Sequence, residues 1–251
     1  MTIQDGSVGQ LDFVERYGLW SDEQTAACER LRAEIKQHDL RTIRIAWGDQ
    51  HGIVRGKNVM AHDFLLALRN GVEFQTATLF MDTTNNLVAP IFSSDAGLGM
   101  TSLAGGPDCI LVPDPTTFRV LPWAPRTGWV LSEMYLANGE PMPFDTRQVM
   151  KRQLSALHER GLDYISGLEV EFYITKIEDR KLLPEQAGWP PDPPEVSVIA
   201  HGFQYLTEQR LDEVDPILQL LHDNLAPLGL PLRTMEDEWG PGQCEITFDP
   251  V

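Results

Sequence analysis

Four glutamates in two short segments, Glu169, Glu171, Glu238 and Glu245, are the residues of this sequence best suited to chemistry. The first two occur in LEVEFYI, whose first five positions alternate apolar and polar residues as a strand does. Residues two apart in a strand lie on one face, about 6.6 Å from each other. At an effective dielectric near 20 their charges repel by roughly 2.5 kcal/mol, which requires an exposed face, a raised pKa or a cation between them.

The second pair of carboxylates flanks a tight turn. Glu238 and Glu245 stand on either side of Gly240-Pro241-Gly242, and the permissive dihedral angles of glycine allow the chain to reverse there. Mg²⁺ and Mn²⁺ prefer oxygen ligands in octahedral geometry. The E-x-E spacing alone is more typical of a solvated strand, but the two segments together favour a divalent-cation site.

The neighbours of these glutamates indicate how the strands are anchored. Leu168, Val170, Phe172 and Ile174 occupy the alternate face of the first strand and are expected to be buried. Cys244, next to Glu245, should point away from the carboxylates and fill the core.

Composition restricts the class of protein. A chain of 251 residues suits one large domain or two modest ones, and 42% hydrophobic with 23% charged residues is ordinary for a globular protein. The net charge of −17 opposes binding to nucleic acid or to anionic lipid surfaces. We therefore expect neither nucleic acid nor membrane as a partner.

Localisation is expected to be cytoplasmic. The first twenty residues lack a basic segment followed by an apolar core, and no stretch approaches eighteen consecutive apolar residues. Cys28, Cys109 and Cys244 are odd in number and widely spaced, which predicts neither a disulfide framework nor a zinc site.

Helices and strands are both predicted, which indicates an α+β protein. Ser21 and Gln24 have capping-box spacing at the start of an amphipathic helix over 21–38. A hairpin is expected around the turn 49–52, followed by a helix over 61–70 that ends at Gly71, and then by strands at 109–112 and 127–136.

Two further helices are predicted in the second half of the chain. Asp145 is a candidate N-cap for a helix that ends at Gly161. A proline-rich stretch over 178–206 is expected to be a long excursion, either a surface insertion or a functional flap. A last helix should begin at Asp215-Pro216, since proline is tolerated in the first turn, and stop before Pro227.

The two glutamate segments resemble the paired metal-ligand motifs of the glutamine synthetase family. GLEVEFYI at 167–174 and EWGPGQCEITF at 238–248 match them in order and separation, and the resemblance extends upstream through 108–123 and 44–57. After the N-terminal helical arm that the helix pattern predicts (1–38), it implies a β-grasp domain (39–130) and the first half of a catalytic domain with an antiparallel sheet and flanking helices (131–251).

The resemblance also implies a chemistry. Glu171, Glu238 and Glu245 would match ligands of a Mg²⁺ or Mn²⁺ ion near the substrate glutamate, and Glu169 a ligand of a second ion near the phosphates of ATP. ATP would phosphorylate the γ-carboxylate of glutamate, and ammonia or an amine would then displace phosphate to form an amide. Asp49 would match an aspartate that attracts ammonium and helps to take its proton, although it is equally an ordinary turn residue. The resemblance further implies homo-oligomeric rings.

Two departures from the family pattern qualify this expectation. The segment 76–86 lacks the Asp-Gly-Ser-Ser loop of typical glutamine synthetases and resembles relatives that use larger amines. The later histidine and arginine motifs are absent, so we expect an incomplete catalytic domain with little activity of its own. A non-catalytic, truncated family member that serves as a binding or assembly module is the alternative.

Overall fold

The computed structural model describes residues 11–93, 98–179 and 183–251. The chain forms two compact units, residues 1–162 (unit 1) and 163–251 (unit 2), each described here by itself. Residues 1–10 of the expected arm and residues 180–182 of the expected excursion lie outside the described residues. The fold is α+β, and the finer division into an arm, a β-grasp domain and an incomplete catalytic domain stays a prediction.

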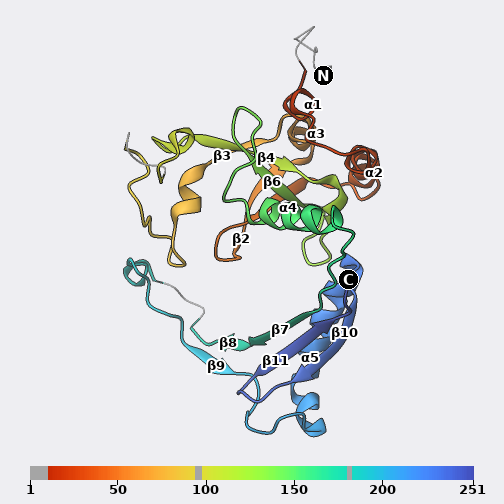
Figure 1. The fold of residues 1–251 in the computed structure, drawn as a ribbon. Helices are drawn as coiled ribbons and strands as arrows, with labels where there is room; N and C mark the ends of the chain where they lie inside the picture. The colour runs from red at the N-terminus through yellow and green to blue at the C-terminus, as the bar shows by residue number, and fades with distance from the viewer. Residues whose placement is uncertain (1–10, 94–97, 180–182) are drawn as a thin grey trace. The chain divides into compact units, whose positions relative to one another are not determined.

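Unit 1 is built on one mixed sheet with the strand order β2-β1-β6-β4-β3, in which β5 also pairs with β6 (Figure 1). Strand β1 runs parallel to β6, and the other pairs are antiparallel. The core of the unit combines apolar side chains from the sheet, from α2 and α3, and from the segments that connect them. Its strands are β1 (Thr42–Gly48), β2 (Val54–Met60), β3 (Val72–Gln75), β4 (Asp108–Pro113), β5 (Arg119–Val120) and β6 (Thr127–Tyr135), and its helices are α1 (Phe13–Tyr17), α2 (Asp22–Gln37), α3 (Ala61–Asn70) and α4 (Thr146–His158).

Local signals in the sequence of unit 1 produce the expected elements. The Ser21 hydroxyl accepts the Gln24 backbone N–H at 3.2 Å, and the Gln24 side chain accepts the Ser21 backbone N–H at 3.0 Å, so the predicted capping box starts α2. Strands β1 and β2 pair around the predicted turn. Helix α3 ends at Gly71, whose positive φ of 70° explains why glycine stands there.

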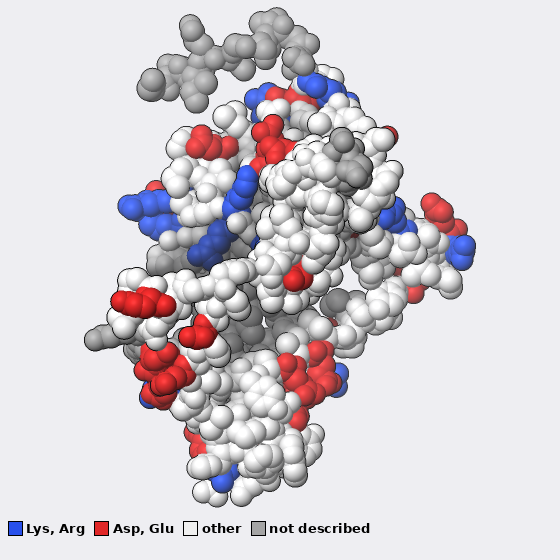
Figure 2. Space-filling model, turned by 90° about the vertical axis from the view of Figure 1, so that its left-hand side faces the viewer, with Lys and Arg blue, Asp and Glu red and all other residues white. Residues whose placement is uncertain are grey.

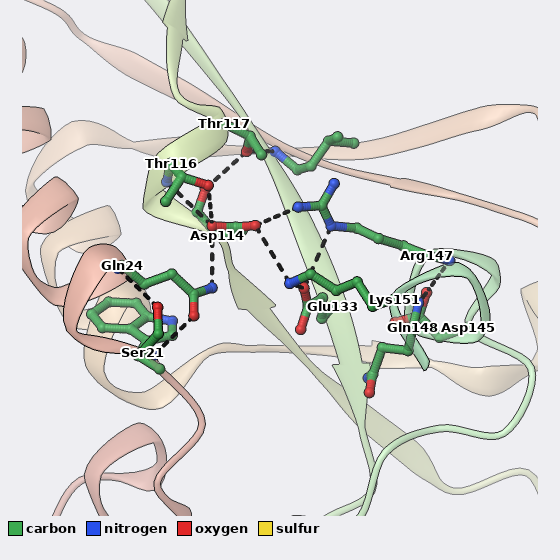
Figure 3. A network of polar contacts seen from close by, with 12 residues as sticks. Ser21, Gln24, Asp114, Thr116, Thr117, Glu133, Asp145, Arg147, Gln148 and Lys151 are labelled. Atoms are coloured by element: carbon green, nitrogen blue, oxygen red, sulfur yellow. Dashed lines mark hydrogen bonds and ion pairs between the residues drawn. The ribbon is translucent and has the colours of Figure 1, made fainter. Parts of the chain in front are cut away.

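A buried polar network connects α2, β4, β6 and α4 (Figure 3). Asp114, directly after β4, accepts a hydrogen bond from the Gln24 side chain at 3.1 Å and forms an ion pair with Arg147 of α4. Glu133 of β6 pairs with Lys151, also of α4. Asp114 and Glu133 are both buried, so each carboxylate loses its hydration water. The polar and cationic partners replace that water with hydrogen bonds and opposite charge.

Unit 2 contains the antiparallel sheet β10-β11-β7, with α5 packed on one face. Val214 and Leu218 of α5 and Cys244 of β11 are buried together, which confirms the expectation for Cys244. The elements of unit 2 are β7 (Leu168–Tyr173), β8 (Thr175–Ile177), β9 (Val196–Val198), α5 (Glu208–Leu225), β10 (Leu232–Asp237) and β11 (Gln243–Phe248). Strands β8 and β9 form a separate two-stranded sheet, in which β8 directly precedes the predicted excursion and β9 lies within it.

The predicted start of the last helix, α5, was wrong. The helix begins at Glu208 rather than at Asp215, and Pro216 lies inside it. Leu211 and Val214, which precede the proline, pack in the same core as Leu218, so burial of a continuous apolar stripe outweighs the backbone hydrogen bond that proline cannot donate. Among the described residues, no helix combines the length and the apolar character needed to cross a membrane.

Candidate metal centre

A row of three glutamates crosses the sheet of unit 2. Glu171 of β7 is the direct partner of Glu245 in β11, and Glu245 is in turn the partner of Glu236 in β10. Their sequence neighbours Phe172 and Cys244 pack toward α5, so the alternation of strand side chains places the glutamates on the opposite face. One face of the sheet is thus apolar and the other is acidic.

Three of the predicted ligands converge on this acidic face. One carboxylate oxygen from each of Glu169, Glu171 and Glu245 lies within 4.8 Å of the others. Glu238, which follows β10, shares a hydrogen bond with Glu245. The structure therefore brings the four sequence-predicted glutamates into one neighbourhood, three of them in a group that a single ion could bridge.

The crowding of these carboxylates has an electrostatic consequence. Burial, the charge of Glu169 and the hydrogen bond with Glu238 raise the pKa of Glu245 to about 7. Near neutral pH a proton thus competes for the position that a cation would take. Oxygen donors at this spacing fit a hard divalent ion such as Mg²⁺ or Mn²⁺ better than a soft one.

The two glycines of the turn are needed for different reasons, one for its backbone conformation and one for its lack of a side chain. Gly242 has a φ of 69°, as predicted from its permissive dihedral angles. Gly240 instead leaves room for a neighbour, since a Cβ at this position would overlap the Tyr173 hydroxyl. The Gly240 backbone N–H donates to the Gln243 side chain at 2.9 Å, which closes the turn.

Three residues around the carboxylates were not identified from the sequence. The Gln243 side-chain amide donates to Glu171 at 2.7 Å and so fixes the orientation of that carboxylate. Glu236 extends the acidic row, and Tyr205 lies close enough that Glu238 and its neighbours raise the pKa of its hydroxyl. Gln243 could have been suspected because it lies two residues before Glu245 in the same strand, whereas Glu236 depends on pairing between strands and Tyr205 comes from a loop without periodicity.

The apolar face of β7 differs from the expectation. Phe172 and Ile174 are partly buried against the core of unit 2, as expected, but Leu168 is 57% exposed and Val170 is 38% exposed. Strand β7 is an edge of the described sheet, and α5 packs toward β10 at the other edge. The first half of β7 is therefore left uncovered within the described part of unit 2.

Asp49 lies in the hairpin turn of unit 1, and its carboxylate is engaged locally. Its Oδ1 accepts the backbone N–H groups of His51 at 2.9 Å and Ile53 at 3.0 Å, and its Oδ2 accepts Nε of Arg55 at 2.8 Å. Burial would raise the pKa of Asp49, but these donors together lower it. The structure thus gives Asp49 a definite role in the turn, while its predicted part in catalysis stays a prediction.

Most of the net negative charge of the chain belongs to unit 2. Residues 163–251 contain 18 acidic and 5 basic residues, whereas residues 1–162 contain 19 and 15. On the face drawn in Figure 2, red Asp and Glu side chains gather over unit 2 with few blue Lys or Arg side chains among them. This field attracts cations toward the unit that carries the four glutamates.

Fold and site together define an α+β protein with an acidic sheet face suited to a divalent ion. Residues 143–251 match the family model of the glutamine synthetase catalytic domain. Gamma-glutamylanilide synthase of Acinetobacter sp is 40% identical over 246 residues, which are 96% of this chain and 49% of that protein. The chain belongs to the glutamine synthetase-like family, as its two motif segments predicted, and it spans about half the length of the curated relatives it matches.

Other similar proteins carry different names. Glutamate–isopropylamine ligase of Pseudomonas sp is 28% identical, with 91% of this chain and 47% of that protein covered. Lengsin of Homo sapiens is also 28% identical, with 88% and 39% covered. The solved structure titled "Apo GmaS without ligand" has a TM-score of 0.62 at 20% identity over 86% of this chain and 44% of that one, a likeness that shows the fold alone.

Proposed function

We propose that this chain is part of an ATP-dependent ligase that joins the γ-carboxylate of glutamate to an amine. The observation that carries the proposal is the convergence of Glu169, Glu171 and Glu245 on one sheet face, within the residues that match the glutamine synthetase catalytic domain. Phosphoryl transfer to a carboxylate needs neutralisation of crowded anionic oxygens, and an acidic face suited to Mg²⁺ or Mn²⁺ is consistent with that need.

Each glutamate has a proposed role. Glu171, Glu238 and Glu245 would hold an ion near the substrate glutamate, and Glu169 would contribute to a second ion near the phosphates of ATP. When bound, these ions neutralise phosphate and carboxylate oxygens and align donor and acceptor. Gln243 acts as a positioning residue, because its hydrogen bond holds one Glu171 oxygen and so orients the carboxylate.

The proposed reaction has two steps. The γ-carboxylate oxygen of glutamate attacks the terminal phosphorus of ATP, which forms a γ-glutamyl phosphate and releases ADP. The amine nitrogen then attacks the acyl carbon, the bond to the phosphate oxygen breaks, and the amine loses a proton as the amide forms. The lowered pKa of Asp49 keeps that carboxylate anionic, which suits the proposed attraction of an ammonium group.

An organic amine is the acceptor we favour over ammonia. Two relatives carry the names of enzymes that use aniline and isopropylamine, and the more similar of these two, at 40% identity, is the anilide synthase. Segment 76–86 lacks the Asp-Gly-Ser-Ser loop of typical glutamine synthetases, which agrees with an acceptor other than ammonia.

The test is phosphate release from ATP and glutamate by the full-length protein that carries this chain. Release should depend on both glutamate and an amine, with aniline or isopropylamine supporting a higher kcat/KM than ammonium. Absence of amine-dependent release with aniline, isopropylamine, methylamine and ammonium alike would contradict the proposal. Mn²⁺ binding without any such release would favour the non-catalytic module instead.

A further inference from the structure

Three exposed aromatic side chains stand beside the carboxylates of unit 2. Phe203 is 65% exposed, Tyr205 is 52% exposed and Trp239 is 57% exposed. The rings of Phe203 and Trp239 meet edge to face, with their centroids 6.0 Å apart and their planes at 77°. Exposed aromatic side chains packed against one another, rather than against the core, mark a surface suited to binding.

The backbone holds this aromatic pair in place. The Phe203 N–H donates to the Trp239 carbonyl at 2.8 Å, which ties the loop over 201–206 to the turn after β10. Gly202 makes the approach possible, because a Cβ there would overlap the backbone of Gly240 and Pro241. Phe203 itself has a φ of 68°, a conformation uncommon for a bulky residue and found most often where function requires it.

The pair is continuous with the acidic face. Trp239 directly follows Glu238, and the Trp239 backbone N–H donates to the Glu238 carboxylate at 3.1 Å. The charge of the same carboxylate is the largest cause of the raised pKa of the Tyr205 hydroxyl. An apolar aromatic surface thus adjoins a concentration of negative charge, which is the arrangement that recognises an amino group attached to an apolar body.

We propose that Phe203 and Trp239 bind the apolar body of the acceptor amine and determine the preference for bulky amines over ammonium. The inference rests on the proposed ligase function and assigns the acceptor class to named residues. The rings contact the aryl or branched alkyl group, while the neighbouring carboxylates attract the nitrogen. A primary amine with an aromatic or branched substituent is the ligand that this combination fits.

The adenine base of ATP is a second ligand that could stack on aromatic rings, and the test separates it from the amine. Direct binding of aniline, methylamine and adenosine to the full-length protein is measured by calorimetry without turnover. The variants are Trp239→Ala, Phe203→Ala and Trp239→Phe. The control is Trp189→Ala, which removes a tryptophan of the same unit that is 68% exposed.

We expect Trp239→Ala and Phe203→Ala each to raise the ratio of the aniline Kd to the methylamine Kd about tenfold, because only aniline has a body for the rings to contact. Trp239→Phe should restore most of the preference, and Trp189→Ala should leave it unchanged.

Unchanged Mn²⁺ affinity verifies that the variants are folded. An unchanged Kd ratio, or weakened adenosine binding alone, would overturn the inference. If the wild type binds aniline more tightly than methylamine but releases no phosphate, the ligase proposal is refuted, whereas the assignment of the amine-binding surface is retained.

Discussion

Glu171 of β7 and Glu245 of β11 face each other directly across an antiparallel ladder, and Glu236 of β10 continues the same row. Like charges in directly opposed positions destabilise a sheet. The row therefore lowers the stability of unit 2 unless a proton or a cation compensates for the repulsion. Binding of a divalent ion and stability of the unit are linked through these side chains.

The linkage predicts opposite effects of one substitution under two conditions. In the presence of a chelator, Glu171→Gln should raise the free energy of unfolding by about 0.5 kcal/mol, because one opposed charge is removed. In saturating Mn²⁺ the same variant should unfold at a lower temperature than the wild type, because a ligand is lost. Thermal unfolding followed by circular dichroism measures both, with Glu185→Gln as an exposed control. The same order of stability in both conditions would contradict the linkage.

The raised pKa of Glu245 predicts how Mn²⁺ binding depends on pH. Its carboxylate must lose a proton to act as a ligand, and that pKa is raised to about 7. Affinity for Mn²⁺ should therefore increase as the pH rises through about 7 and level off above it. In Glu245→Gln this increase should disappear. A wild-type affinity independent of pH between about 6 and 8 would show that Glu245 is not a ligand.

The buried network around Asp114 predicts a loss of stability in unit 1. Asp114→Asn removes one of the two carboxylates that pair with Arg147, the other being Glu133 at 3.5 Å, and should lower the free energy of unfolding by roughly 2 kcal/mol at neutral pH. Asp22→Asn, at an exposed position on α2, is the control. Denaturant unfolding gives both values, and equal losses would contradict the assigned role of the network (Figure 3).

The same network predicts the sign of a pH effect. Burial would raise the pKa of Asp114, but Thr116, Arg147, Gln24 and Lys151 together hold that pKa below its usual range. A carboxylate with a lowered folded-state pKa contributes stability above its unfolded pKa and loses it as the pH falls through the folded value. The difference between wild type and Asp114→Asn should therefore shrink below about pH 4. A difference that persists in acid would point to packing rather than charge.

Helix α5 predicts a stabilising substitution. Pro216 is exposed and lies within the helix, where it cannot donate a backbone hydrogen bond. Pro216→Ala should raise the free energy of unfolding by about 1–2 kcal/mol. Pro227→Ala, in the 3₁₀ turn after the helix, should give no such gain, since proline is tolerated in a first turn. Equal effects of the two substitutions would contradict this explanation.

Local patterns of the sequence predicted the elements that local interactions determine. The capping box of Ser21 and Gln24, the hairpin around Asp49 and the alternation in β7 each depend on residues close in the chain. The start of α5 was predicted wrongly because a local signal, Pro216, competes with burial in the tertiary fold.

The parts of the site that the sequence did not predict depend on pairing between distant segments. Glu236 joins the acidic row only through the register of β10 on β11, which a single sequence does not determine. Phe203 reaches Trp239 through a loop with a left-handed backbone conformation, and no periodicity indicates such a contact.

The most direct test of the metal centre is titration of the chain with Mn²⁺, with the free ion followed by its electron paramagnetic resonance signal. Wild type should remove Mn²⁺ from solution, and Glu171→Gln and Glu245→Gln should each weaken that binding by roughly tenfold or more, while Glu185→Gln should not. Titration curves of the two cluster variants that coincide with the wild-type curve would contradict the central claim that these glutamates form a divalent-cation site.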